Sequence, residues 1–96
     1  MTRLEYLLVC AAEECSEVAQ AITKALRFGL NDINPKLGVT AQERIEAEIN
    51  DLYATLESLQ MYGIDTVPNA DLMEKKREKI QRYIRYSYER GSGGDF

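Results

Sequence analysis

Residues 4–26 read LEYLLVCAAEECSEVAQAITKAL, and this stretch decides the fold. Its apolar residues recur every three or four positions, which is the spacing of one side of an α-helix. Thr2 and Glu5 form the capping-box pattern that opens a helix, and Gly29 is the residue type that ends one. We therefore expect a helix from about Thr2 to Phe28. Its predicted apolar stripe is Leu4, Leu7, Leu8, Ala11, Ala12, Cys15, Val18, Ala19, Ile22, Ala25 and Leu26.

A second helix follows a loop. Residues 30–39 are rich in Asn, Asp, Pro and Gly, which are typical of loops. Thr40 and Glu43 repeat the capping-box pattern, and Gly63 marks the end of a helix that reaches about Tyr62. Its predicted apolar stripe is Ile45, Ile49, Leu52, Tyr53, Leu56 and Leu59.

A third helix is predicted after a turn at residues 64–70. Asp71 and Glu74 have capping-box spacing, and apolar residues continue at helical intervals to Ile84. No segment has the alternating pattern of a strand, so the predicted fold class is all-α.

We expect one domain over residues 1–90 and a flexible glycine-rich tail at 91–96. The first helix would be about 40 Å long, and two shorter helices cannot cover its apolar stripe. The expected architecture is therefore a core of long antiparallel helices, of the four-helix-bundle type, completed by homo-oligomerisation into a homodimer or a tetramer made of two dimers.

Composition excludes several classes of function. The 96 residues contain no histidine, which removes histidine-based catalysis and most zinc sites. The two cysteines are too few for a disulfide framework, so we expect reduced thiols and a cytoplasmic location. No apolar run is long enough to cross a membrane. Residues 1–71 hold five Lys and Arg against twelve Asp and Glu, a balance that argues against nucleic-acid binding.

The carboxylates of the first two helices are arranged in pairs. Glu14 and Glu17 stand one turn apart, and so do Glu48 and Asp51. Helical projection places Glu14 about 80° and Glu48 about 70° from the centres of their apolar stripes. Each pair should therefore lie at the edge of a buried face, where four carboxylates could converge if the two helices pack together.

Four anions at a partly buried seam repel one another unless a cation compensates them. Oxygen ligands without His or Cys suit Mg²⁺, Mn²⁺ or Ca²⁺, and Mg²⁺ retains open positions for phosphate oxygens and water. The alternative is that these residues are solvated helix flanks, since Glu is a strong helix former.

Two motifs make the chain similar to a known family. Glu13-Glu14-x-x-Glu17, followed on the next helix by Glu48-x-x-Asp51, resembles the signature of the MazG-like, all-α nucleoside triphosphate pyrophosphohydrolases, a superfamily that includes dimeric dUTPases. The likeness extends over about residues 4–85.

This resemblance implies Mg²⁺-dependent hydrolysis of a nucleoside triphosphate to its monophosphate and pyrophosphate, with water attacking the α-phosphorus; Mn²⁺ could substitute for Mg²⁺. By position, Glu14, Glu17, Glu48 and Asp51 would hold the metal, and Glu13 would be an outer or second-metal ligand. Either Glu14 or Glu17 would be the catalytic residue that orients or deprotonates the water. Related enzymes are dimers or tetramers, which agrees with the expected assembly.

Basic residues are needed for the remaining phosphates. Lys24 lies two turns beyond Glu17 and could reach the same site, although it could equally be a surface lysine. On the third helix the resemblance implies basic residues against the triphosphate, and Lys76 and Lys79 are the nearest to the apolar stripe. The alternative there is a charged helix with glutamate counterions.

Two other functions remain open at this point. A non-catalytic helical adaptor would explain the apolar stripes, because such stripes also dock partner proteins. A degenerate family member would bind nucleotide without turnover. A thermal melt with and without divalent metal separates the adaptor from the enzyme.

Overall fold

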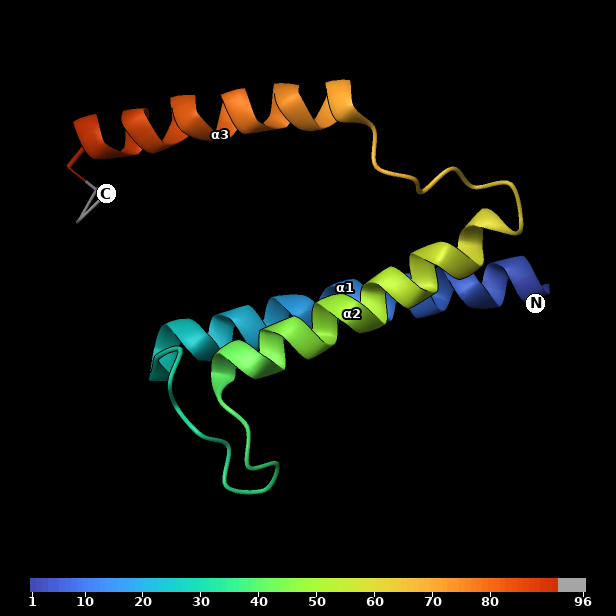
Figure 1. Ribbon diagram of the computed structural model, residues 1–96, viewed down its shortest axis with the longest axis horizontal. Helices are drawn as coiled ribbons and strands as arrows, with labels where there is room; N and C mark the ends of the chain where they lie inside the picture. Colours follow the sequence, from blue (N-terminus) through green and yellow to red (C-terminus); the bar gives the residue numbers. More distant parts are fainter. Residues whose placement is uncertain (92–96) are drawn as a thin grey trace. The chain divides into compact units, whose positions relative to one another are not determined.

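A computed structural model describes residues 1–91 of the chain. It contains three α-helices, α1 (Arg3–Phe28), α2 (Ala41–Gln60) and α3 (Ala70–Glu89), as Figure 1 shows. The described residues form no strand, only one isolated bridge between Ile33 and Thr40. The predicted all-α class is confirmed. The expected flexible tail lies outside the described residues, apart from Gly91.

The chain divides into two compact units, Met1–Thr66 and the residues from Val67 onward. The first unit contains α1 and α2, and the second contains α3. No helix in the described part of the chain is both long and apolar enough to cross a membrane.

Capping boxes open the first two helices, as predicted. The Thr2 hydroxyl accepts a hydrogen bond from the Glu5 N–H at 3.1 Å, and the Glu5 carboxylate accepts one from the Thr2 N–H at 3.0 Å. Thr40 and Glu43 make the same two bonds at 3.1 and 3.0 Å. Each pair satisfies backbone donors that a helix start leaves unpaired.

The start of α3 differs from its prediction. Asn69 is the capping residue, and its side-chain oxygen accepts a hydrogen bond from the Leu72 N–H at 2.9 Å. Asp71 therefore lies inside the first turn, so the predicted capping box at Asp71 and Glu74 is wrong. Asn and Asp are about equally good caps, and spacing alone could not choose between them.

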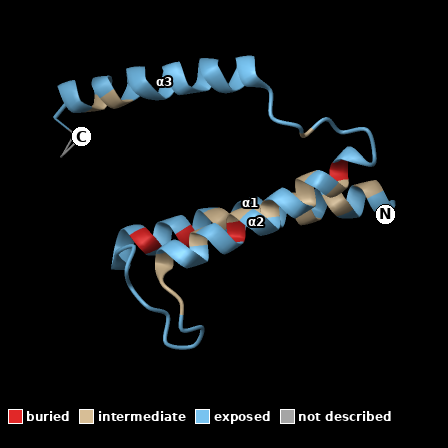
Figure 2. Cartoon of the chain, viewed as in Figure 1, coloured by how far each residue is buried: buried red, intermediate tan, exposed pale blue. Residues whose placement is uncertain are grey.

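The helices α1 and α2 pack side by side in opposite directions (Figure 1). The residues that become half-buried or buried follow an alternating spacing of three and four, as in a coiled coil. Along α1 they include Leu4, Leu7, Ala11, Glu14, Val18, Ala21 and Ala25; along α2 they include Ala41, Ile45, Glu48, Leu52, Thr55 and Leu59. The most buried of these are Ala21, Ala25, Leu59 and Glu48 (Figure 2). We call this set of positions the α1–α2 seam.

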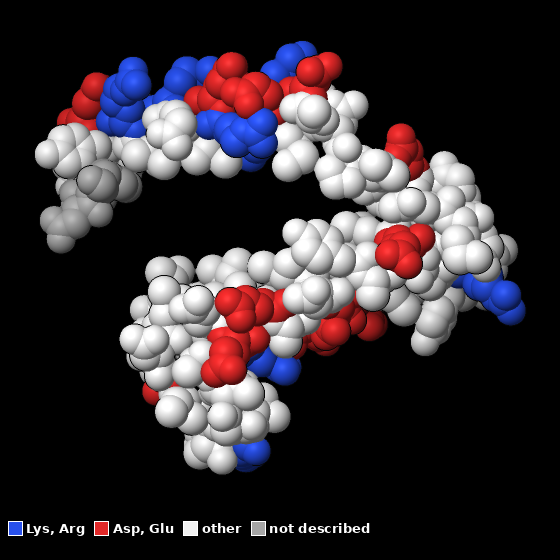
Figure 3. Space-filling model, viewed as in Figure 1, with Lys and Arg blue, Asp and Glu red and all other residues white. Residues whose placement is uncertain are grey.

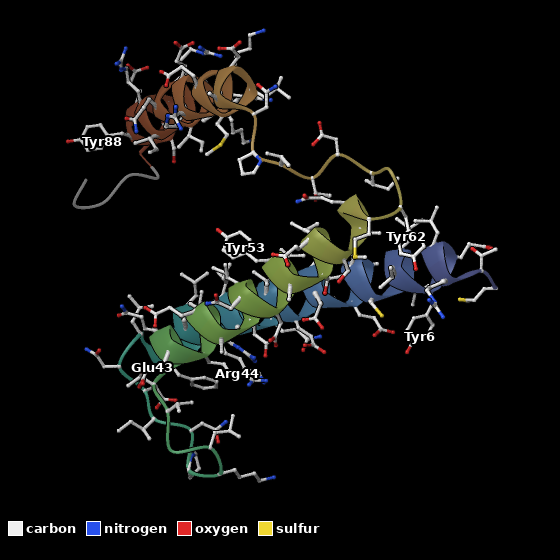
Figure 4. All side chains as sticks on the ribbon, turned by 45° about the vertical axis from the view of Figure 1, so that its right-hand side comes forward. Tyr6, Glu43, Arg44, Tyr53, Tyr62 and Tyr88 are labelled. Atoms are coloured by element: carbon white, nitrogen blue, oxygen red, sulfur yellow. The ribbon has the colours of Figure 1, made fainter. Side chains whose placement is uncertain are left out.

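The predicted apolar stripe of α1 is too broad for one partner helix. Its other members form a second row with spacing of four and three, and α2 leaves this row exposed. Tyr53 of α2 also points outward and is 63% exposed (Figure 4). We call the second row the outer face of α1; it consists of Leu8, Ala12, Cys15, Ala19, Ile22 and Leu26.

The loop between α1 and α2 is tied down by hydrogen bonds. Gly29, at φ 97°, ends α1 in a backbone conformation that favours glycine, and its N–H donates to the Ala25 carbonyl at 2.8 Å. The Asn34 side chain accepts hydrogen bonds from the backbone of Lys36 at 2.8 Å and Leu37 at 3.1 Å. These hydrogen bonds thus hold the loop in one conformation beside the first turn of α2.

The helix α3 is amphipathic. Its charged side chains gather along one face and its uncharged side chains along another (Figure 3). Arg77 and Glu74 form an ion pair at 2.6 Å on the charged face. Ile84 and Ser87 are the half-buried residues of α3, and its other residues are exposed.

Candidate metal centre

Three of the predicted metal ligands come together where α1 and α2 pack. Glu14 and Glu17 of α1 and Glu48 of α2 each offer a carboxylate oxygen, and these oxygens lie within 4.8 Å of one another. The antiparallel pairing of the helices produces this meeting, because it brings the middle of one against the middle of the other. We call these three residues the carboxylate centre.

Glu48 is the most enclosed member of the carboxylate centre. The residue is only 3% exposed, so its carboxylate has almost no access to bulk water. One oxygen, Oε1, pairs with Arg44 Nη2 at 2.7 Å. The other oxygen, Oε2, is buried without a hydrogen-bond partner, and so is Oε2 of Glu14. Buried carboxylate oxygens without partners are costly and call for a proton or a cation to satisfy them.

The surroundings raise the pKa of Glu48. Burial is the main cause, and the adjacent Glu17 side chain raises the pKa further. The nearby Arg44 guanidinium lowers it, whereas the charges of Glu17 and Asp51 raise it again. Without a metal, Glu48 therefore keeps its proton to a higher pH than an ordinary glutamate does.

The pKa of Glu14 is raised as well. Burial is again the largest cause, followed by the negative charges of Asp51, Glu48 and Glu13. Every charge that shifts this carboxyl is negative, in contrast to Glu48 with its Arg44 partner. A divalent cation at the centre would offset both causes of the raised pKa of Glu14. It would coordinate the desolvated carboxylate, and its positive charge would compensate the negative neighbours.

The spacing of the three oxygens fits a hard cation. Carboxylate oxygens bind Mg²⁺ at about 2.0–2.1 Å and Ca²⁺ at about 2.3–2.6 Å. Oxygens within 4.8 Å of one another are therefore near enough for one ion of this class to lie among them. The absence of His and Cys from the centre favours Mg²⁺ or Mn²⁺ over zinc.

Asp51 and Glu13 lie outside this trio. Asp51 is exposed, yet its charge raises the pKa of both Glu14 and Glu48, which places it within electrostatic range. Glu13 is exposed beside Glu14 and raises the pKa of that residue. The structure thus brings three predicted ligands into contact and leaves these two at the border, where their roles stay predictions.

Helical projection misjudged how deep the carboxylates lie. It placed Glu14 and Glu48 at the edges of the buried faces, and both occupy seam positions instead. The predicted stripe of α1 combines two rows of apolar residues, of which only one contacts α2. When the residues of the outer face are left out, the angular centre of the apolar stripe of α1 lies closer to Glu14.

Arg44 was not among the predicted site residues. It stands one turn before Glu48 on α2, and this i, i+4 spacing is the signal that could have identified it. Its side chain lies near the loop at residues 29–40 (Figure 4). The centre is therefore not purely anionic, and Arg44 provides a positive charge at one side of it.

The predicted phosphate-binding lysines fall in different parts of the chain. Lys24 lines a pocket of about 240 Å³ between the end of α1, the loop and the start of α2, and Arg44 lines the same pocket. Lys76 and Lys79 lie on α3, in the second unit, where Lys79 Nζ is 5.9 Å from the centre of the Tyr83 ring. Lys24 and Arg44 thus line one pocket, and Arg44 also pairs with Glu48 of the carboxylate centre.

No protein-family model matches the chain, and no curated protein or solved structure matches it significantly.

Proposed function

We propose that the chain is a divalent-metal-dependent hydrolase that converts nucleoside triphosphates, of the ribo or deoxy series, to monophosphates and pyrophosphate. The observation that carries this proposal is the buried, unpartnered Oε2 of Glu48 within a trio of carboxylates. Mg²⁺ is the proposed cofactor, and Mn²⁺ would substitute for it. The similarity of the two acidic motifs to those of the MazG-like pyrophosphohydrolases supports the same assignment.

The carboxylate centre has the properties that phosphate chemistry needs. Its ligands come from two packed helices, which hold them more rigidly than a loop would. A bound divalent cation would neutralise charge on phosphate oxygens and make a bound water more acidic. Three carboxylates leave ligand positions free for phosphate and water.

The three glutamates take different roles in this proposal. Glu14 and Glu48 are held in the seam and serve as fixed metal ligands. Glu17 is the exposed member, so it faces the substrate side and is the candidate to orient the attacking water or to accept its proton. Asp51 and Glu13 complete the acidic border as further ligands or charges.

Basic residues would bind the part of the triphosphate that the metal does not hold. Lys24 and Arg44 border the same pocket beside the centre, and both can donate to phosphate oxygens. Lys76 and Lys79 on α3 remain proposed phosphate ligands on the basis of the resemblance alone.

The proposed assembly is a homodimer or a dimer of dimers. The outer face of α1 repeats the spacing of the α1–α2 seam and remains exposed, with Leu8 at 44%, Ile22 at 43% and Leu26 at 83%. A second copy that packs on this face would complete a bundle of the predicted four-helix type. The proposed location is cytoplasmic, in keeping with the free thiols of Cys10 and Cys15.

Thermal melting in EDTA and in millimolar Mg²⁺ or Mn²⁺ tests the metal centre. A ligand that binds only the folded state stabilises it, so the metal should raise the melting temperature of the wild type clearly. Glu17→Gln should reduce this rise, whereas Glu57→Gln, an exposed control on the same unit, should retain it. An equal melting temperature with and without metal would favour the helical adaptor instead.

A further inference from the structure

The pocket beside the carboxylate centre has a composition unlike that of the centre itself. Phe28, Pro35 and Val39 give it apolar walls, whereas Asp32 and Asn34 add a few polar groups. Ligand pockets for flat organic groups are typically apolar with a small number of hydrogen-bonding groups that fix orientation. The pocket thus suits an aromatic ring with polar edges better than it suits a bare phosphate chain.

Its size indicates how much of a ligand it can hold. The volume of about 240 Å³ is slightly below the roughly 300–1,000 Å³ of pockets that enclose whole small molecules. A single base with its sugar is therefore a better match than an entire nucleoside triphosphate, which would have to extend outside.

Arg44 connects this pocket to the carboxylate centre. It lines the pocket, and its guanidinium also pairs with Glu48 at 2.7 Å. On the other helix, Ala21 lines the pocket one turn beyond Glu17, a rise of about 6 Å along α1. The α-phosphate of a nucleotide is bonded directly to its sugar, so a site for the nucleoside must adjoin the site for the phosphates. This pocket meets that requirement.

We propose that the pocket between α1, the loop at 29–40 and α2 binds the base and sugar of the triphosphate, while the carboxylate centre holds its phosphates. The inference rests on the proposed function, since it needs phosphates at the centre. Arg44 then stands at the junction, where the sugar meets the α-phosphate, and Lys24 lines the nucleoside pocket. The loop hydrogen bonds made by Asn34 keep the outer wall in place before the ligand arrives.

Two variants of the pocket test this assignment. Val39→Trp places a large ring inside the pocket, and its backbone carbonyl still accepts the hydrogen bond from Asn34. Phe28→Ala removes an apolar wall at a residue that is 62% exposed, so the fold should tolerate it. Leu37→Trp is the matched control, because it adds the same ring on the same loop outside the pocket lining.

Binding to the full-length chain with Mg²⁺ present is measured by calorimetry with two probes. The first is the tightest of a panel of non-hydrolysable α,β-imido nucleoside triphosphates, and the second is inorganic triphosphate, which has no nucleoside. We expect Val39→Trp and Phe28→Ala to weaken nucleotide binding by about tenfold or more and to leave inorganic triphosphate within about twofold. Leu37→Trp should change neither affinity.

Three results would overturn the inference. Equal affinity of the wild type for the two probes would mean that no nucleoside site exists. Nucleotide affinity unchanged in both folded pocket variants would place the nucleoside elsewhere, with the phosphate site intact. Failure of the wild type to bind either probe would overturn the proposed function itself, and this outcome differs from the other two because inorganic triphosphate also fails.

Discussion

Glu48 is a carboxylate at a position that helix packing would normally give to an apolar side chain. It lies in the α1–α2 seam, 3% exposed, with one oxygen paired to Arg44 and the other unpartnered. A buried ion pair rarely stabilises a fold more than apolar residues of the same size do. The proposed metal site would account for this cost to the metal-free fold, because a metal ligand needs the charge.

Replacement of Glu14 by Gln should raise the melting temperature of the metal-free protein. The ionised carboxylate of Glu14 is desolvated and repelled by Asp51, Glu48 and Glu13, which is why its pKa is raised. The amide is neutral and can donate a hydrogen bond to a neighbouring carboxylate. Melting in EDTA at pH 7.5 measures the difference, and a lower melting temperature in the variant would show that this repulsion is absent.

Glu48→Gln is a less direct probe of the same repulsion. The sequence predicted four uncompensated carboxylates, and the Arg44 ion pair shows that Glu48 is partly compensated. Its replacement would relieve repulsion and lose that pair, so the two effects oppose each other. Every charge that raises the pKa of Glu14 is negative, so its replacement relieves desolvation and repulsion without the opposing effect of Arg44.

Turnover should fall at least about a hundredfold in Glu17→Gln and in Asp51→Asn, since each removes a charge from the proposed metal site while it keeps the side-chain shape. Initial rates of pyrophosphate release at saturating Mg²⁺ measure the effect. Glu57→Gln, on the exposed side of α2, is the control and should retain wild-type rates. Near-normal rates in both site variants would remove these residues from the metal site.

At the scale of the helices, the metal-free α1–α2 pair should gain stability as the pH falls from neutral. Glu14 and Glu48 have raised pKa values, so their ionisation costs the folded state free energy. This destabilising free energy is at its maximum above the pKa values of the folded state and decreases as the pH falls through them. The destabilisation is fully removed below pH 4.5, the ordinary pKa of a glutamate, where the unfolded chain also takes up its protons.

The capping glutamates, Glu5 and Glu43, give folding stability the opposite dependence on pH. Hydrogen bonds to Thr2 and Thr40 lower the pKa of Glu5 and of Glu43, so their stabilisation is present above 4.5 and is lost as the pH falls below it. Metal-free stability should therefore have its maximum at a mildly acidic pH. Melting curves in EDTA from pH 7.5 to 4 measure it, and Glu14→Gln should flatten the acidic rise. A decline from pH 7.5 to 5 would contradict the raised pKa values.

Local sequence signals predicted the helices well because their causes are local. The boxes of Thr2 with Glu5 and of Thr40 with Glu43 need only three residues of spacing, and both are present. The depth of Glu14 and Glu48 depends on which face of α1 meets α2. That choice is made by packing, where the small side chains of Ala21 and Ala25 allow close approach, and no local pattern reveals it.

In the candidate site, too, local signals could be predicted and features that depend on packing could not. The acidic motifs predicted that four carboxylates could converge if the first two helices packed together, and the structure brings the three residues Glu14, Glu17 and Glu48 within 4.8 Å of one another. The pocket formed by Phe28, Val39 and the loop could not be predicted, since it depends on the backbone path between two helices.

At the scale of the whole molecule, the chain should be at least a dimer. The helix α2 leaves the apolar row on the outer face of α1 uncovered, and such a row favours association at roughly 25 cal/mol per Å² of apolar area buried. Light scattering at micromolar concentration should give at least twice the 10.9 kDa of one chain. Ile22→Glu on this face should shift the mass toward one chain, whereas Leu30→Glu in the exposed loop should not. A wild-type mass near 10.9 kDa would contradict this assembly.

The central claim is water attack at the α-phosphorus of a nucleoside triphosphate, and product analysis in H₂¹⁸O tests it most directly. A panel of ribo and deoxy triphosphates is incubated with the full chain and Mg²⁺, with an EDTA control, and the products are followed by ³¹P NMR. We predict that ¹⁸O enters the nucleoside monophosphate, that pyrophosphate is released unlabelled, and that EDTA abolishes both. Orthophosphate as the first product, ¹⁸O in the pyrophosphate, or no turnover of any triphosphate would contradict the account.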